Sequence, residues 1–189
     1  MSIEIEAKLK VDSLKPIEEK LKSLGAEFVV EQLQSDEHFD DAQSTLKNGD
    51  RCLRLRRQQV GGKTKYILTY KGAKEKSNFK KRQEIEVEIT NEESMEQLLS
   101  ALGYERKLCV KKKRRLWRLG GCEVALDELA LLGCFVEIEG PDVQKIADVQ
   151  NKIGLSHIPH TPESYASLVE RMLRTNDARE TKDEGRKTK

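Results

Sequence analysis

Charged side chains occupy every second position near the start of the chain, in the segment EIEAKLK (residues 4–10). Glu4, Glu6 and Lys8 alternate there with apolar residues. Because a β-strand points successive side chains to opposite faces, the three charges would share one face. Carboxylates in a row suit hard divalent cations, and lysine suits phosphate oxygens. A solvated sheet face would show the same alternation, so other segments have to distinguish the two interpretations.

The same alternation predicts strands along much of the chain. These strands are residues 3–11, 51–58, 64–71, 82–90, 110–118, 122–128 and 134–139. Pairs of glycines at 61–62 and 120–121 each separate two strands, as hairpin turns do. Helical spacing of apolar residues predicts helices at residues 14–24, 95–102, 143–153 and 165–172. The strand and helix of residues 4–27 resemble those of residues 84–105, which indicates a pseudo-two-fold repeat of a β-α-β-β unit.

The polar faces of these strands carry almost only ionisable side chains, and the two signs are segregated between strands. The cations are Lys8, Arg54, Arg56, Lys71, Arg82, Lys112 and Arg114. The carboxylates are Glu4, Glu6, Glu84, Glu86, Glu88, Glu123, Asp127, Glu137 and Glu139. If the sheet curls into a barrel with helices on its apolar outside, these charges line a lumen. Enclosing them without a ligand would be costly. The pattern therefore favours a tunnel for a polyphosphate with Mg²⁺ or Mn²⁺.

The composition argues against several classes of protein. The 189 residues are 36% charged with a net charge of +2, which lacks the basic excess of a plain nucleic-acid binder. No apolar run is long enough for a membrane span, so we expect a cytoplasmic protein without a membrane partner. The four cysteines form no C-x-x-C pair, which argues against zinc and disulfides. Residues 174–189 are nearly devoid of apolar side chains and predict a disordered charged tail after a domain of residues 1–173.

The ordered set of motifs resembles the CYTH superfamily, the triphosphate tunnel metalloenzymes. The motifs are ExExK (4–8), LRLR (53–56), TYKG (69–72), RQEIEVE (82–88), VKKKRRLW (110–117), ALDEL (125–129) and LGCFVEIE (132–139). Within the superfamily the chain is most similar to the class IV adenylyl cyclase group. The resemblance implies an α+β fold, an eight-stranded antiparallel barrel or tunnel with flanking helices.

The resemblance also implies roles for the charged residues. Metal ligands would come from Glu4, Glu6, Glu84, Asp127, Glu137 and Glu139, with Glu84 and Asp127 ordering the cations or a second metal. The triphosphate would be held, and charge on its leaving group neutralised, by Lys8, Arg54, Arg56, Lys71, Arg82, Lys112 and Arg114. The register of the basic run is open, because Lys111 and Lys113 could replace Lys112 and Arg114. The spacing to Trp117 favours the latter pair.

The expected protein is a divalent-metal-dependent enzyme that acts on a triphosphate, as a monomer or homodimer. The favoured reaction is conversion of ATP to cAMP and pyrophosphate. One alternative is an inorganic or thiamine triphosphatase that uses water as nucleophile in the same tunnel. A second is a non-catalytic nucleotide- or polyphosphate-binding module, against which the carboxylates argue because phosphate binding alone needs only the cations.

Overall fold

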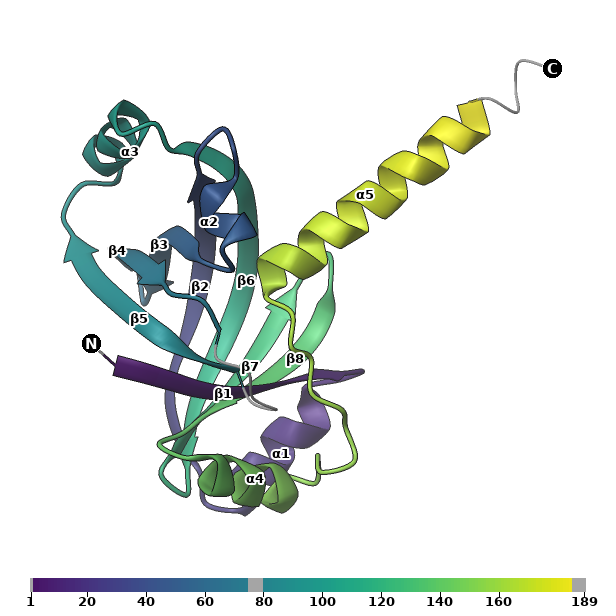
Figure 1. Cartoon of the computed structure of the whole chain (residues 1–189). Helices are drawn as coiled ribbons and strands as arrows, with labels where there is room; N and C mark the ends of the chain where they lie inside the picture. The colour runs from purple at the N-terminus through teal and green to yellow at the C-terminus, as the bar shows by residue number, and fades with distance from the viewer. Residues whose placement is uncertain (1, 75–79, 185–189) are drawn as a thin grey trace.

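The strands form one closed antiparallel barrel. The computed structural model describes residues 2–74 and 80–184, with the backbone alone for 2–4, 80–81 and 176–184 (Figure 1). Within these residues the strands are β1 (Ser2–Val11), β2 (Glu27–Asp40), β3 (Cys52–Val60), β4 (Lys63–Lys71), β5 (Lys80–Ile89), β6 (Glu105–Leu119), β7 (Cys122–Leu129) and β8 (Gly133–Glu139). They are hydrogen-bonded in the order β1-β5-β4-β3-β2-β6-β7-β8, and β1 closes the barrel by pairing with both β5 and β8. The predicted eight-stranded antiparallel barrel with flanking helices is confirmed.

The helices lie outside the barrel. They are α1 (Lys15–Ser23), α2 (Thr45–Asn48), α3 (Glu92–Ala101), α4 (Val143–Lys152) and α5 (Tyr165–Glu184). Asn91 and Asp142 cap α3 and α4, because each side chain accepts a hydrogen bond from a backbone N–H three residues later, at 2.8 Å. None of the described helices combines the length and the apolar character needed to cross a bilayer.

The largest apolar core lies on the outer face of β1, β7 and β8. Leu9, Val124 and Val136 are fully buried there, in a cluster that includes Leu21 of α1 and Ile146 of α4. Figure 1 shows α1 and α4 together below this part of the barrel. Because side chains alternate along a strand, burying these apolar residues outside turns the charged residues between them toward the lumen.

The alternation of charged and apolar residues did not predict β2. Its inward positions carry Gln32, Gln34 and Asp36, while its outward positions mix Leu33 with Ser35, so neither face is apolar. The strand nevertheless pairs along its length with β6, and its second half, residues 33–39, pairs with β3. The order β1-α1-β2-β3-β4 is repeated as β5-α3-β6-β7-β8, apart from the short α2. The β-α-β-β unit predicted from the sequence therefore has one strand fewer than the unit observed in the structure.

The last helix continues beyond the predicted end of the domain. Residues 174–184, predicted as part of a disordered tail, form the outer part of α5. Figure 1 shows this part projecting away from the barrel. Residues 185–189 lie outside the described residues, and the domain boundary at residue 173 stays a prediction.

Candidate functional site

A charged cavity of about 680 Å³ lies inside the barrel. Its wall takes side chains from all eight strands and from the start of α5. Of the predicted site residues, it is lined by Glu6, Lys8, Arg54, Arg56, Lys71, Arg82, Glu84, Lys112, Arg114, Glu137 and Glu139. Cavities of roughly 300–1,000 Å³ are typical of small-molecule sites. Residues far apart in the sequence are therefore brought together around a space that could hold a nucleotide.

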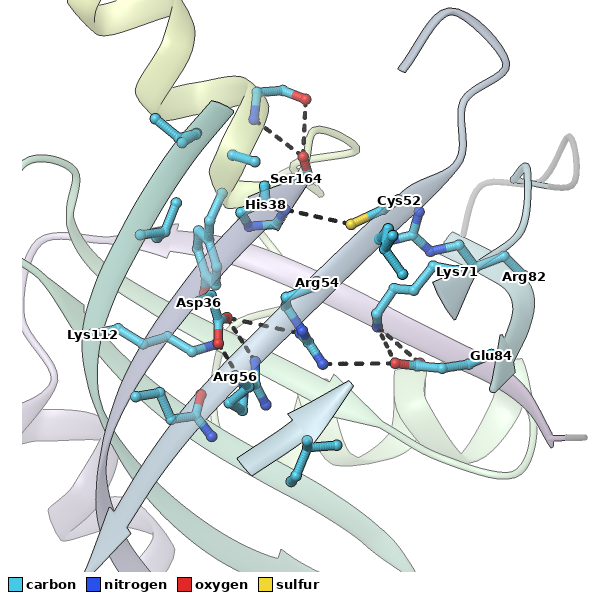
Figure 2. A pocket seen from close by; sticks show the side chains of 18 of the residues that line it. Asp36, His38, Cys52, Arg54, Arg56, Lys71, Arg82, Glu84, Lys112 and Ser164 are labelled. Carbon is cyan, nitrogen blue, oxygen red and sulfur yellow. Dashed lines mark hydrogen bonds and ion pairs between the residues drawn. The ribbon is translucent and has the colours of Figure 1, made fainter. Parts of the chain in front are cut away.

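Arg54 and Arg56 of β3 are held by a carboxylate that the sequence analysis missed. Nε and Nη2 of Arg56 donate to the two carboxylate oxygens of Asp36 at 2.6 and 2.7 Å, and Nη1 of Arg54 lies 3.8 Å from Oδ2 (Figure 2). Burial by itself would raise the pKa of Asp36, but the charges of Arg54 and Arg56 hold it well below its usual range. Asp36 therefore stays ionised and fixes both guanidinium groups in the cavity wall.

Lys112 and Arg114 of β6 share a second buried carboxylate. Asp127 is fully buried, and its oxygens accept hydrogen bonds from Nε of Arg114 at 2.6 Å, Nζ of Lys112 at 3.2 Å and the hydroxyl of Tyr165 at 2.9 Å. Burial would raise the pKa of Asp127, but Arg114 and Lys112 outweigh it and lower the pKa. Arg114 also forms an ion pair with Glu137. With three partners and no exposure, Asp127 is placed to order cations.

The basic run of β6 points Lys112 and Arg114 into the cavity. Lys111 is exposed, and Lys113 forms an ion pair with Glu31 at 3.0 Å, 43% of its side chain being exposed. Burial, followed by the nearby charge of Arg114, lowers the pKa of Lys112 to about 8. The structure therefore places Lys112 and Arg114 in the cavity wall, and these are the two residues that the spacing to Trp117 favoured.

Tyr165, at the start of α5, contacts Lys8 and Lys112, two of the lysines that line the cavity. Nζ of Lys8 and Nζ of Lys112 lie 4.3 and 4.9 Å from its ring centroid, within cation–π range. The carbonyl of Glu163 accepts a hydrogen bond from Lys8 at 3.2 Å. The sequence alone predicts Tyr165 as a packed residue and not as a cavity residue, because apolar spacing places it on the packed face of the helix. Its ring does pack against Phe135 there.

Two of the predicted cations, Lys71 and Arg54, have further carboxylate or hydroxyl neighbours. Nζ of Lys71 lies 2.7 Å from Oε1 of Glu84, and Nη2 of Arg54 lies 3.9 Å from the same atom. Arg54 also donates to the hydroxyl of Thr69 at 2.9 Å. Arg82 is 7% exposed and lies nearby in the same view (Figure 2). Glu84 is thus placed among cations, as Asp36 and Asp127 are.

Another part of the wall places carboxylates beside one another around Lys8 of β1, whose Nζ lies 3.8 Å from Oε1 of Glu6 and 3.2 Å from Oε1 of Glu137. Glu6 of β1 lies opposite Glu139 of β8, which lies opposite Glu123 of β7. Directly opposed residues on one face have Cβ atoms about 5 Å apart. Among the described residues, no three His, Cys, Asp or Glu side chains already converge as metal ligands. The backbone of Glu4 pairs with Arg82, while its side chain lies outside the described residues. A row of carboxylates is nevertheless the donor set that a hard cation requires.

His38 is a further cavity residue on β2. Its Nδ1 lies 3.4 Å from the sulfur of Cys52 (Figure 2), and burial lowers its pKa to about 4. The imidazole is therefore neutral at physiological pH. Polar residues at positions 32, 34, 36 and 38 were the one sequence signal that could have revealed this wall.

Comparisons of the sequence and of the structure with known proteins point to the same family. The sequence pattern of the CYTH domain matches residues 2–165. A protein of Methanocaldococcus jannaschii, named as a candidate adenylate cyclase, is 32% identical over 150 residues, which cover 79% of this chain and 81% of that protein. Adenylate cyclase CyaB of Aeromonas hydrophila is 27% identical over 183 residues, 92% of each. Among solved structures, the PH1819 protein of Pyrococcus horikoshii matches with a TM-score of 0.76 and 29% identity, covering 89% of this chain and 99% of that one.

Proposed function

This chain belongs to the CYTH domain family, and from that premise we propose that it is a divalent-metal-dependent enzyme that converts ATP to cAMP and pyrophosphate. The observation that carries the proposal is the division of the cavity wall. Cations held by buried carboxylates stand on one part, and carboxylates in register with carboxylates stand on another. A triphosphate bound with a metal ion satisfies both parts.

The cationic residues of β3 and β6 would hold the phosphates. Arg54, Arg56 and Arg114 offer guanidinium groups, which bind phosphate oxygens through two parallel hydrogen bonds. Asp36 and Asp127 keep these groups oriented before the substrate arrives. The wall is therefore preorganised, and less reorganisation is needed as charge develops in the transition state.

The remaining predicted cations would complete the anion site. Lys8, Lys71, Lys112 and Arg82 line the same cavity and bring positive charge from β1, β4, β6 and β5. When the ribose hydroxyl of ATP attacks the α-phosphorus, negative charge grows on the departing pyrophosphate. Lysine and arginine side chains around that group neutralise the charge and lower the barrier.

Glu6 and Glu139, together with Glu4, would hold the metal ion. Their carboxylates suit Mg²⁺ or Mn²⁺, and Glu137 would contribute beside its ion pair with Lys8. When bound, such an ion polarises the reacting phosphoryl group and lowers the pKa of the attacking hydroxyl. Glu84 and Asp127, among the cations, would order them.

Turnover with three substrates tests this proposal. The protein is incubated with ATP, inorganic triphosphate or thiamine triphosphate, each with Mg²⁺ or Mn²⁺ and with EDTA. We expect cAMP and pyrophosphate in equal amounts from ATP, and no turnover in EDTA. Phosphate released without cAMP would contradict the cyclase and support the triphosphatase. The absence of turnover with every substrate would contradict both, and binding alone would then support the non-catalytic module.

A further inference from the structure

One stretch of the cavity wall is uncharged and built from amide side chains. Gln32 and Gln34 of β2 and Gln58 of β3 line the cavity, and we call these three residues the amide wall. Ile67 and Leu116 line the cavity as well and add apolar surface. In register, Gln34 lies opposite Gln58 on β3 and opposite Lys112 on β6. The amide wall therefore borders the cations directly.

Gln34 keeps one polar atom without a partner. The side chain is 3% exposed, and its Nε2 donates to Oε1 of Gln58 at 3.2 Å. Its own oxygen, Oε1, is buried and accepts no hydrogen bond from any described residue. Buried amide groups in native proteins almost always find partners, so Oε1 of Gln34 has an acceptor position left for a donor inside the cavity. If the two amides were turned over together, one atom of Gln34 would still lack a partner.

The position of the amide wall fits the uncharged end of a nucleotide. Gln58 follows Arg56 by two residues on the same strand, which corresponds to about 7 Å. Gln34 and Asp36 have the same spacing on β2. A nucleoside triphosphate held by Arg56 therefore needs only a short reach to place its base here. Glutamine offers an acceptor and a donor in one plane, the pair that matches the adenine edge.

We propose that the amide wall binds the base of a nucleoside triphosphate, with Gln34 accepting a hydrogen bond from the exocyclic amino group of adenine. This inference rests on the proposed function, because it requires the phosphates to lie against the neighbouring cations. The base is a part of ATP that inorganic triphosphate lacks. The amide wall is thus the feature that would distinguish ATP from inorganic triphosphate in this cavity.

Equilibrium binding in EDTA tests the inference without turnover. Calorimetric titrations compare ATP, inorganic triphosphate and purine riboside triphosphate, which differs from ATP only by lacking the 6-amino group. We expect the wild type to bind ATP about tenfold more tightly than purine riboside triphosphate, the scale of one hydrogen bond. Gln34→Leu should remove this preference and leave the affinity for inorganic triphosphate unchanged.

Two further variants keep the result interpretable. Gln59→Leu is the matched control, because Gln59 pairs with Leu33 on the outer face of the same strands and should change none of the three affinities. Gln58→Leu removes the neighbouring amide and should weaken ATP selectively, which provides a second test if Gln34→Leu does not fold. Equal wild-type affinities for ATP and purine riboside triphosphate would overturn the inference. So would a Gln34→Leu protein that loses ATP and inorganic triphosphate equally. A wild type that binds no triphosphate at all would instead overturn the proposed function.

Discussion

The two sides of the cavity handle charge in opposite ways. On the side formed by β2, β3 and β6, Arg56 is held by the buried Asp36 of β2, and Arg114 is held by the buried Asp127 of the adjoining strand β7. On the side formed by β1, β7 and β8, carboxylates of Glu6, Glu139 and Glu123 stand opposite one another in register. The first side is organised before an anion arrives, whereas the second groups several carboxylates around the single ammonium of Lys8, which lies 3.8 Å from Glu6, and this set suits a divalent cation. We expect substitutions on the two sides to affect different ligands.

The largest effect on stability should come from the carboxylate behind the cations. Asp127→Asn keeps the shape but removes the buried counter-ion of Lys112 and one of the two carboxylate partners of Arg114, which keeps its ion pair with Glu137. Removing one partner of such a buried group typically costs about 3–5 kcal/mol of unfolding free energy. Urea denaturation should show this loss, whereas Glu128→Gln, at the exposed neighbouring position, should change stability by less than about 0.5 kcal/mol. Equal stabilities of the two variants would contradict the role given to Asp127.

Arg56→Ala should have the largest effect on anion binding. The cavity loses a guanidinium and keeps Asp36, whose charge then repels phosphate. We expect the affinity for inorganic triphosphate to fall about 100-fold, the scale of a lost charge-assisted pair. Arg57→Ala is the control, because Arg57 is exposed on the outer face of the same strand.

Adding Asp36→Asn to Arg56→Ala tests the cause of that loss. The double variant should regain part of the affinity, because the repelling carboxylate is gone. Calorimetry that found Arg57→Ala as damaging as Arg56→Ala, or no recovery in the double variant, would break the proposed contrast between the two sides.

A smaller, pH-dependent effect should come from Lys112. Its pKa of about 8 lies below the usual lysine value, so the unliganded protein loses this charge as the pH rises through about 8. A bound triphosphate favours the protonated form, and binding above that pH must therefore take up a proton. The affinity should fall by up to about tenfold per pH unit there.

Lys112→Arg keeps the charge at every accessible pH and should remove this contribution to the slope. Inorganic triphosphate also titrates, so the comparison is between the slopes of the two proteins measured from about pH 7 to about pH 9. Identical slopes would show that Lys112 does not set the pH dependence of binding.

Prediction from the sequence succeeded for the strands that have one apolar and one charged face. The strands carrying Lys8, Arg54 and Arg114 were predicted on that basis, and their charges do line the cavity. It missed β2, because polar residues occupy both faces, and with it Asp36 and Gln34. Those two residues depend on pairings that a local pattern does not contain, because Asp36 meets Arg56 only when β2 pairs with β3. For the same reason, a spacing rule identified Tyr165 as a packed residue without indicating its hydroxyl bond to Asp127.

The different roles of the two sides are tested most directly by measuring the affinity of the protein for inorganic triphosphate with and without Mg²⁺. Glu6→Gln removes the charge that a hard cation needs and keeps the shape of the side chain. The variant should bind triphosphate like the wild type in EDTA and lose the gain in affinity that Mg²⁺ provides. Arg56→Ala should weaken binding in both conditions. A Glu6→Gln protein that keeps the full Mg²⁺-dependent gain would contradict the account, because the carboxylates would then have no part in holding the metal.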